Sequence, residues 1–276
     1  MTKLPIDIKT RPLSYSSLKQ FRKSPKHYIQ YITEPRKPPS PDMIMGNAFE
    51  LRLYAFSSKN DEMYRDGIYI YTKPNLRSNA GKEEWEQIKV AGEGKIMITE
   101  EQAAIVESMI VAMQDYPEMV SYVESFIKTQ TKLLWTDRKT RIPFIGYVDA
   151  EGNAFDDDWI FDIKVTKDAD PNDFQRAAFN WDYHIQMASY AEGYHRTQFR
   201  FPNFAFLCFD PNPPYNCAPI MIESNVMEES REEWRRSVDA FKFCMDEELF
   251  HQGYEFRLQT MPYFSLRKLG YYRPKF

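Results

Sequence analysis

Residues 159–165 read Trp159-Ile160-Phe161-Asp162-Ile163-Lys164-Val165, and this stretch decides the fold. Side chains along a β-strand alternate between its two faces, so the apolar side chains at the odd positions are expected on one face. Asp162 and Lys164 then share the other face. A surface ion pair of this kind would contribute only about 0–1 kcal/mol. The neighbouring residues therefore decide whether the pair carries chemistry.

A second strand is expected directly before this one, because residues 144–148 are largely apolar and end on the carboxylate Asp149. The acidic run 156–158 is interpreted as a solvated hairpin turn between the two strands. The hairpin would place Asp149 beside Asp162, and adjacent carboxylates repel unless a cation such as Mg²⁺ lies between them. A lysine two residues from a metal-bound aspartate can orient or deprotonate a metal-bound water. The hairpin therefore predicts nuclease-like chemistry.

A helix is expected after the hairpin, and it contains Tyr183-His184-x-Gln186-x-x-x-Tyr190. Gln186 and Tyr190 are one helical turn apart and therefore share a face. Together with Asp149 and Asp162-Ile163-Lys164, this helix resembles the PD-(D/E)xK nuclease superfamily. Within that superfamily the motifs are similar to the exonuclease VIII (RecE-type) branch of phage and prophage recombination exonucleases.

The resemblance implies an α/β fold with a restriction-endonuclease-like core, in which a central mixed β-sheet is flanked by helices. We expect residues 1–276 to form a single exonuclease domain with helical N-terminal elements and a basic C-terminal tail. The implied catalytic residues are Asp149, Asp162, Lys164, Gln186 and Tyr190. The implied ligands of one or two Mg²⁺ or Mn²⁺ ions are Glu50, Asp149, Asp162 and the carbonyl of Ile163.

Glu50 departs from the family pattern. It ends the segment Gly46-Asn47-Ala48-Phe49-Glu50, on a helix expected over residues 42–56, where the family usually reads G-x-A-x-H. A glutamate is also a ligand for hard metal ions, and the alternative is a solvent-facing helix residue. Relatives often carry a further glutamate on the strand expected over 127–135, where this chain has Thr129 or Gln130. Metal binding would then depend more heavily on Glu50.

Charge is distributed unevenly along the chain, whose net charge is −4. Residues 1–40 hold nine Lys and Arg against two acidic residues, and residues 257–276 hold five against none. Basic ends suit a protein that contacts phosphates, although ordinary solvated charge remains the alternative. The candidate DNA contacts are the outward-facing Lys19, Arg22 and Lys23 of the first helix, and Arg77 and Lys82 of the polar, turn-rich segment 59–94.

The remaining composition excludes several classes of protein. Cys208, Cys217 and Cys244 are too few for a disulfide framework and are one short of the four thiolates that usually hold an iron–sulfur cluster. We therefore expect reduced thiols and no iron–sulfur cluster. The chain has no apolar run of about 18 residues and no signal-peptide pattern at its N-terminus. A cytoplasmic protein without a membrane partner is expected.

The motifs predict a divalent-metal-dependent exodeoxyribonuclease that degrades linear double-stranded DNA during recombination. Action at duplex ends, 5′→3′ polarity, a ring-shaped homo-oligomer and a single-strand annealing recombinase as partner are implied by the resemblance alone. A RecB-like or CRISPR-associated nuclease acting on single strands is the alternative enzyme. A non-catalytic DNA-binding or partner-docking protein on a nuclease fold is the alternative of another class.

Overall fold

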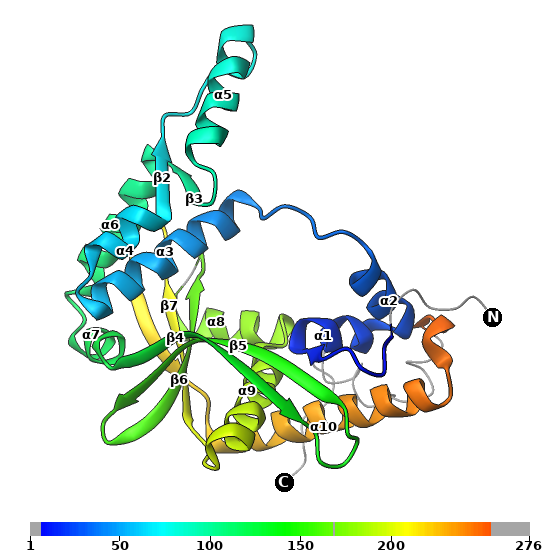
Figure 1. Ribbon diagram of the computed structural model, residues 1–276. Helices are drawn as coiled ribbons and strands as arrows, with labels where there is room; N and C mark the ends of the chain where they lie inside the picture. The colour runs from blue at the N-terminus through cyan, green and yellow to red at the C-terminus, as the bar shows by residue number, and fades with distance from the viewer. Residues whose placement is uncertain (1–6, 168, 255–276) are drawn as a thin grey trace.

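A mixed six-stranded sheet forms the centre of the computed structural model, which describes residues 7–167 and 169–254 (Figure 1). Its strands are β1 (Leu13–Ser14), β4 (Phe126–Thr136), β5 (Pro143–Ala154), β6 (Asp157–Val165), β7 (Asn203–Phe209) and β8 (Cys217–Met221). This sheet and its flanking helices confirm the expected α/β fold.

Strand β5 is the organising strand of the sheet. Along one edge it pairs with antiparallel β4. Its other edge is shared, because β1 pairs in parallel at Phe144 and Ile145 while β6 pairs antiparallel from Ala150 to Ala154. On that edge, residues 146–149 of β5 come after the residues that pair with β1 and before those that pair with β6. On its far side β6 pairs in parallel with β7, and β7 pairs antiparallel with β8.

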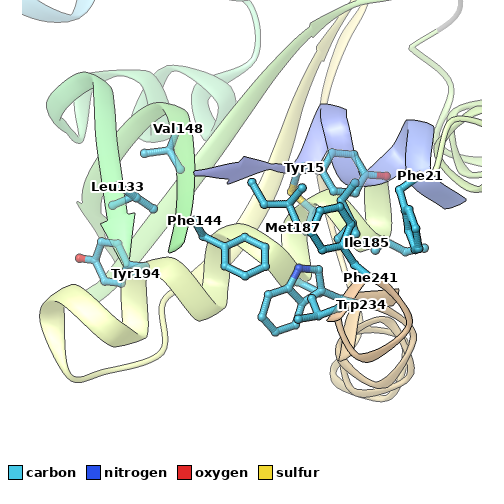
Figure 2. Close-up of a cluster of buried hydrophobic side chains, with 14 of the residues drawn as sticks. Tyr15, Phe21, Leu133, Phe144, Val148, Ile185, Met187, Tyr194, Trp234 and Phe241 are labelled. Atoms are coloured by element: carbon cyan, nitrogen blue, oxygen red, sulfur yellow. The ribbon is translucent and has the colours of Figure 1, made fainter. Parts of the chain in front are cut away.

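One face of the sheet is covered by α9 (Tyr183–Gln198), with α10 (Ser224–Asp246) below it and α1 (Tyr15–Lys23) and α2 (Pro25–Thr33) at its end (Figure 1). Apolar side chains from these elements converge on the sheet in Figure 2, so α9 is held between the sheet and α10. The labelled residues of this first core include Leu133, Phe144, Val148, Ile185, Met187, Trp234 and Phe241.

The opposite face carries α3 (Pro41–Ser58), α4 (Asp61–Gly67), α6 (Glu100–Met113) and α7 (Pro117–Glu124). The Phe49 ring of α3 meets the Phe209 ring of β7 edge-on, with centroids 4.6 Å apart. Trp159, Phe161 and Ile163 of β6 lie in this second core, as the alternation predicted. The sheet is thus buried on both faces, and α3 is fixed against it by apolar packing.

An arm projects from this body in Figure 1. It consists of the parallel pair β2 (Ile68–Tyr71) and β3 (Ile96–Thr99) and the helix α5 (Asn79–Ala91). The segment 59–94 is therefore more regular than its polar composition predicted, because α4, β2 and α5 all fall within it. The other described elements are α8 (Pro171–Asn180) and the short 3₁₀ helix η1 (Leu249–His251).

Helix ends follow the polar signals in the sequence. Ser14 caps α1 in a reciprocal capping box with Ser17, and Ser24 caps α2, whose first residue is Pro25. The buried apolar side chains of these two helices include Leu18, Phe21 and Tyr28. In the described part of the chain, no helix is both long and apolar enough to cross a membrane.

The three cysteines, Cys208, Cys217 and Cys244, are buried and carry free thiols. The basic C-terminal tail lies outside the described residues for all but its first two positions, 253 and 254.

Candidate active site

The candidate site lies where β5 and β6 part. Their pairing ends at Ala150 and Phe161. Beyond this point the Asp149 carboxylate Oδ2 accepts a hydrogen bond of 2.8 Å from the backbone N–H of Ile163. A side-chain oxygen thus replaces a backbone carbonyl as the acceptor of this bond. The negative charge of Asp162 is near enough to raise the pKa of Asp149. The hairpin predicted from the sequence places the two aspartates together.

Lys164 forms an ion pair with the buried carboxylate of Asp162 through its Nζ. The same Nζ lies 4.8 Å from the centroid of the Tyr183 ring, at the first turn of α9. Burial acts to lower the pKa of Lys164, but the negative charges of Asp162 and Asp149 outweigh it and raise that pKa above its usual value. Lys164 is therefore a fixed positive charge within the site.

Helix α9 adds two polar side chains from the other side. Gln186 Nε2 lies 3.0 Å from the Tyr190 hydroxyl and 3.5 Å from Asp162 Oδ1. The Tyr190 ring packs on Gly146 of β5, where a Cβ atom would lie 3.1 Å from ring atom Cε1. A Cβ at position 146 would therefore require the Tyr190 ring to shift by a few tenths of an ångström. The predicted pair Gln186 and Tyr190 is thus brought to Asp162.

Glu50 reaches the site from α3, which packs on the face of the sheet opposite to α9. Its Oε1 accepts hydrogen bonds from the Tyr54 hydroxyl and from Gln130 Nε2. The Tyr54 hydroxyl lies 2.8 Å from the Asp149 carbonyl oxygen and accepts a bond of 3.1 Å from Gln130. Three elements, α3, β4 and β5, are therefore tied together around the Glu50 carboxylate.

Tyr54 is the residue that sequence reasoning missed, and Gln130 was considered only as a replacement for a glutamate. The available signal for Tyr54 was its position, four residues after Glu50 on the same helix face. Gln130 has a positive φ of 51° in β4, which is rare for a residue other than glycine. No local pattern in the sequence indicates that conformation.

Two of the three carboxylates, those of Asp149 and Glu50, have raised pKa values. Burial is the main cause of the raised pKa of Asp149, and the charges of Asp162 and Glu50 raise it further. Burial also raises the pKa of Glu50, although the hydrogen bonds from Tyr54 and Gln130 oppose the shift. One lysine faces three acidic groups, so the site attracts an additional cation.

The donor chemistry fits a hard divalent ion, because the candidate ligands are carboxylate oxygens. Asp149 and Asp162 would hold it, with Glu50 as the third acidic side chain. As placed, no three acidic, His or Cys side chains of the described residues converge into a complete metal-binding group. Glu50 is held by Tyr54 and Gln130, and Ile163 contributes its N–H to Asp149, so the metal-binding roles of Glu50 and of the Ile163 carbonyl stay predictions.

A cavity of about 600 Å³ opens between the start of α1 and residues 145–147 of β5. Tyr190 borders both the cavity and the Gln186–Asp162 contact. The basic and aromatic residues of its wall are Arg11, Tyr15, Tyr31, Arg36, Tyr147 and Tyr190. Tyr31 is 39% exposed and lines this space.

The predicted DNA contacts do not form one group. Arg22 was expected to face outward, but it is buried and pairs with Asp182 at 3.6 Å and with Glu233, so that prediction is wrong. Its charge is needed between two carboxylates of α9 and α10. Lys19 is hydrogen-bonded to the Trp181 carbonyl, and Lys23 is exposed on α1. Arg77 and Lys82 are exposed on the projecting arm (Figure 1).

The mixed sheet between two helical layers, with Asp149, Asp162 and Lys164 at its parting strands, defines a PD-(D/E)xK-type nuclease fold. Residues 14–253 match the profile of a family described as "PDDEXK-like domain of unknown function (DUF3799)". The chain belongs to this family, which confirms the superfamily predicted from the motifs.

A solved structure agrees with this fold. The chain is similar to the crystal structure of a provisionally named exonuclease from Eubacterium rectale, with a TM-score of 0.55 and 14% identity over 97% of this chain and 85% of that one. A second structure, SSO0001, matches with a TM-score of 0.26 and 8% identity over 79% of this chain and 83% of its own, and it supports no argument. No curated protein sequence matches this chain.

Proposed function

We propose that this protein is a divalent-metal-dependent nuclease that hydrolyses phosphodiester bonds of DNA. The observation that carries the proposal is the grouping of Asp149, Asp162 and Lys164 where β5 and β6 part, with Glu50 held nearby by Tyr54 and Gln130. Such a cluster is unfavourable without a cation. If these side chains served only to stabilise the fold, neutral or fully paired residues would be more favourable at these positions. The arrangement therefore favours a catalytic role.

Each residue has a role in this proposal. Asp149 and Asp162 would hold Mg²⁺ or Mn²⁺, with Glu50 and the Ile163 carbonyl as further ligands. A divalent ion held there would supply Lewis-acid chemistry, which lowers the pKa of a water molecule and offsets charge on the scissile phosphate. Lys164 stays protonated because of its acidic neighbours, so it holds the attacking water and offers positive charge to the phosphate. Gln186 and Tyr190 orient Asp162 and the reacting phosphate group.

The substrate we propose is the end of linear double-stranded DNA, cut progressively as by an exonuclease of the exonuclease VIII type. The cavity beside Tyr190 supports this, since Arg11 and Arg36 in its wall suit phosphates and its tyrosines suit bases. The name of the Eubacterium rectale protein points the same way. The 5′→3′ polarity, a homo-oligomeric ring, and a single-strand annealing recombinase as partner come from the family resemblance.

The test compares linear duplex DNA with covalently closed circles, each incubated with the protein and Mg²⁺. We expect linear DNA to be degraded and closed circles to persist. Strands labelled at the 5′ or 3′ end report polarity, with early release of the 5′ label expected. Circles degraded as fast as linear DNA would indicate an endonuclease, and preferential loss of single strands would indicate the RecB-like alternative.

A non-catalytic DNA-binding protein is a second candidate, because Glu50 is engaged by Tyr54 and Gln130 and the acidic groups do not converge fully. Calorimetric titration with Mn²⁺ separates the two. The nuclease binds the ion, and Asp149→Asn removes that binding. A protein that binds DNA but takes up no Mn²⁺ or Mg²⁺ is the non-catalytic alternative.

A further inference from the structure

We infer that Trp181 is a stacking platform for a base of the substrate strand next to the carboxylates, an inference that rests on the proposed nuclease function. Trp181 is the C-cap residue of α8 and is 58% exposed. Tyr183, two residues later, has the Lys164 ammonium 4.8 Å from its ring centroid. A large indole is therefore displayed to solvent at the border of the site, where burial in a core does not explain it.

The turn that carries Trp181 is fixed on both sides. The Trp181 N–H donates a 2.8 Å bond to the Ala177 carbonyl, and the Trp181 carbonyl accepts a 2.5 Å bond from Lys19 Nζ. The next residue, Asp182, has a left-handed φ of 57°, and its carbonyl accepts a 2.6 Å bond from the buried Tyr15 hydroxyl. A platform that is already held in place loses little conformational entropy when a base stacks on it.

The charge around the indole suits a polyanion. Lys19 Nζ lies 5.2 Å from the centroid of the Trp181 ring, in a cation–π contact. Tyr15 lines the cavity beside the site, and its hydroxyl donates a hydrogen bond to the Asp182 carbonyl, so the turn that carries Trp181 is tied to a residue of the cavity wall. Bases of every sequence have a π-face that stacks on an aromatic side chain, while a nearby ammonium attracts the phosphates. Lys19 and Trp181 thus match the two repeating parts of a nucleic-acid strand.

Exposure alone does not single out Trp181, since Phe199 is 81% exposed. Phe199 is the C-cap residue at the opposite end of α9, away from the turn at Asp182. It is therefore a matched control, because its substitution removes an exposed aromatic ring from the other end of the same helix. If exposed aromatic rings served only to dock other proteins, Trp181→Ala and Phe199→Ala would have the same effect on DNA binding.

The first experiment measures DNA affinity with the full chain in an Asp162→Asn background, which prevents degradation. The probe is a fluorescein-labelled duplex with a single-stranded tail, followed by anisotropy. Trp181→Ala is expected to raise Kd about 5- to 100-fold, which is the range for loss of one stacked base. Trp181→Phe should restore most of the affinity, and Phe199→Ala should leave Kd unchanged.

The second experiment identifies stacking itself. Single abasic positions are introduced one at a time along the tail and next to the duplex junction. At one position we expect the abasic probe to bind the Asp162→Asn protein more weakly, while the added Trp181→Ala change removes that difference. If Trp181 had only a structural role, Trp181→Ala would weaken the binding of intact and abasic probes equally.

The outcomes separate this inference from the proposed function. If the wild-type protein degrades DNA but Trp181→Ala and Phe199→Ala bind the probes equally well, the stacking role is wrong and the nuclease assignment stands. If affinity falls without any dependence on a base, Trp181 has only a structural role. If the wild-type protein neither binds nor degrades DNA, both proposals are wrong.

Discussion

Asp149 accepts the backbone N–H of Ile163 through Oδ2 at 2.8 Å, at the position where β5 and β6 stop pairing. The bond holds the Asp149 carboxylate between the two strands, near Asp162. Because Asp149 is also buried among negative charges, its pKa is well above the usual value. The hydrogen bond therefore fixes a carboxylate whose ionisation costs free energy.

We predict that Asp149→Asn abolishes DNA degradation while stabilising the metal-free protein. A raised pKa means that the folded state holds a proton which the unfolded state loses, so wild-type stability falls as the pH rises above the ordinary carboxyl range. Asparagine has no such ionisation and can still accept the Ile163 N–H. At pH 8 in EDTA we expect a gain of about 1 kcal/mol, or about 2–4 °C in Tm. A lower Tm for the variant across the pH range would contradict this account.

The same shifts predict the pH dependence of metal binding. Asp149 and Glu50 must lose their protons to bind a cation, and both pKa values are raised, mainly by burial. Metal affinity should therefore increase with pH above the usual carboxyl range, and binding should release protons. Calorimetry of Mn²⁺ binding in buffers of different ionisation enthalpy measures the proton release. Binding without proton release near pH 6 would contradict the raised pKa values.

Tyr54→Phe tests the contacts around Glu50. The variant keeps the ring and removes the hydroxyl that reaches both Glu50 and the Asp149 carbonyl. Loss of a group that orients a ligand lowers metal affinity or activity about 10- to 100-fold, and we expect that range for DNA degradation. Tyr64→Phe is a matched control, because Tyr64 is also buried in the second core. Equal activity of the two variants would show that Tyr54 does not position Glu50.

Gly146→Ala tests the packing of Tyr190. The added Cβ would lie 3.1 Å from the Tyr190 ring, so the ring and its bond to Gln186 must shift. We expect kcat for DNA degradation to fall at least about tenfold, since small misplacements of positioning groups are costly. Gly46→Ala is the control, because no atom lies within 4 Å of its added Cβ and alanine favours the α3 helix. It should be as stable as wild type or more stable.

Asp137 forms a structural ion pair that is independent of the candidate site. Its buried carboxylate accepts two bonds from Arg235, of 2.6 and 3.0 Å, and one from the Thr140 hydroxyl. Burial opposes ionisation, but these bonds outweigh it and lower the pKa to about 2. Asp137→Asn should destabilise the protein by about 3 kcal/mol at pH 7. The contribution should be lost as the pH falls from about 4 to about 2, and urea unfolding at several pH values measures it.

The sequence was sufficient for the elements whose determinants are local. Alternating apolar residues located β6, and the two aspartates of the hairpin were correctly placed together. These features depend on neighbours within a few residues. The pairing of Gln186 with Tyr190 also follows from helical spacing alone.

The features that were missed depend on residues distant in sequence. Arg22 looks like a surface charge on a basic helix, but Glu233 and Asp182, which neutralise it, lie in α10 and at the start of α9. On α8, Phe174 packs against Phe206 of β7 while Phe179 is 49% exposed, and that difference depends on contacts with a distant strand. Tyr54 meets the Asp149 carbonyl across 95 positions of chain. No local pattern predicts such contacts.

The central claim is that Asp162 and Lys164 catalyse metal-dependent hydrolysis of DNA. The most direct measurement is the degradation of linear duplex DNA by wild type, Asp162→Ala and Lys164→Ala, with Mg²⁺ or with EDTA, after circular dichroism has shown that all three fold. We predict degradation by the wild type with Mg²⁺ only, and none by either variant. Undiminished degradation by the folded variants, or degradation in EDTA, would contradict the account.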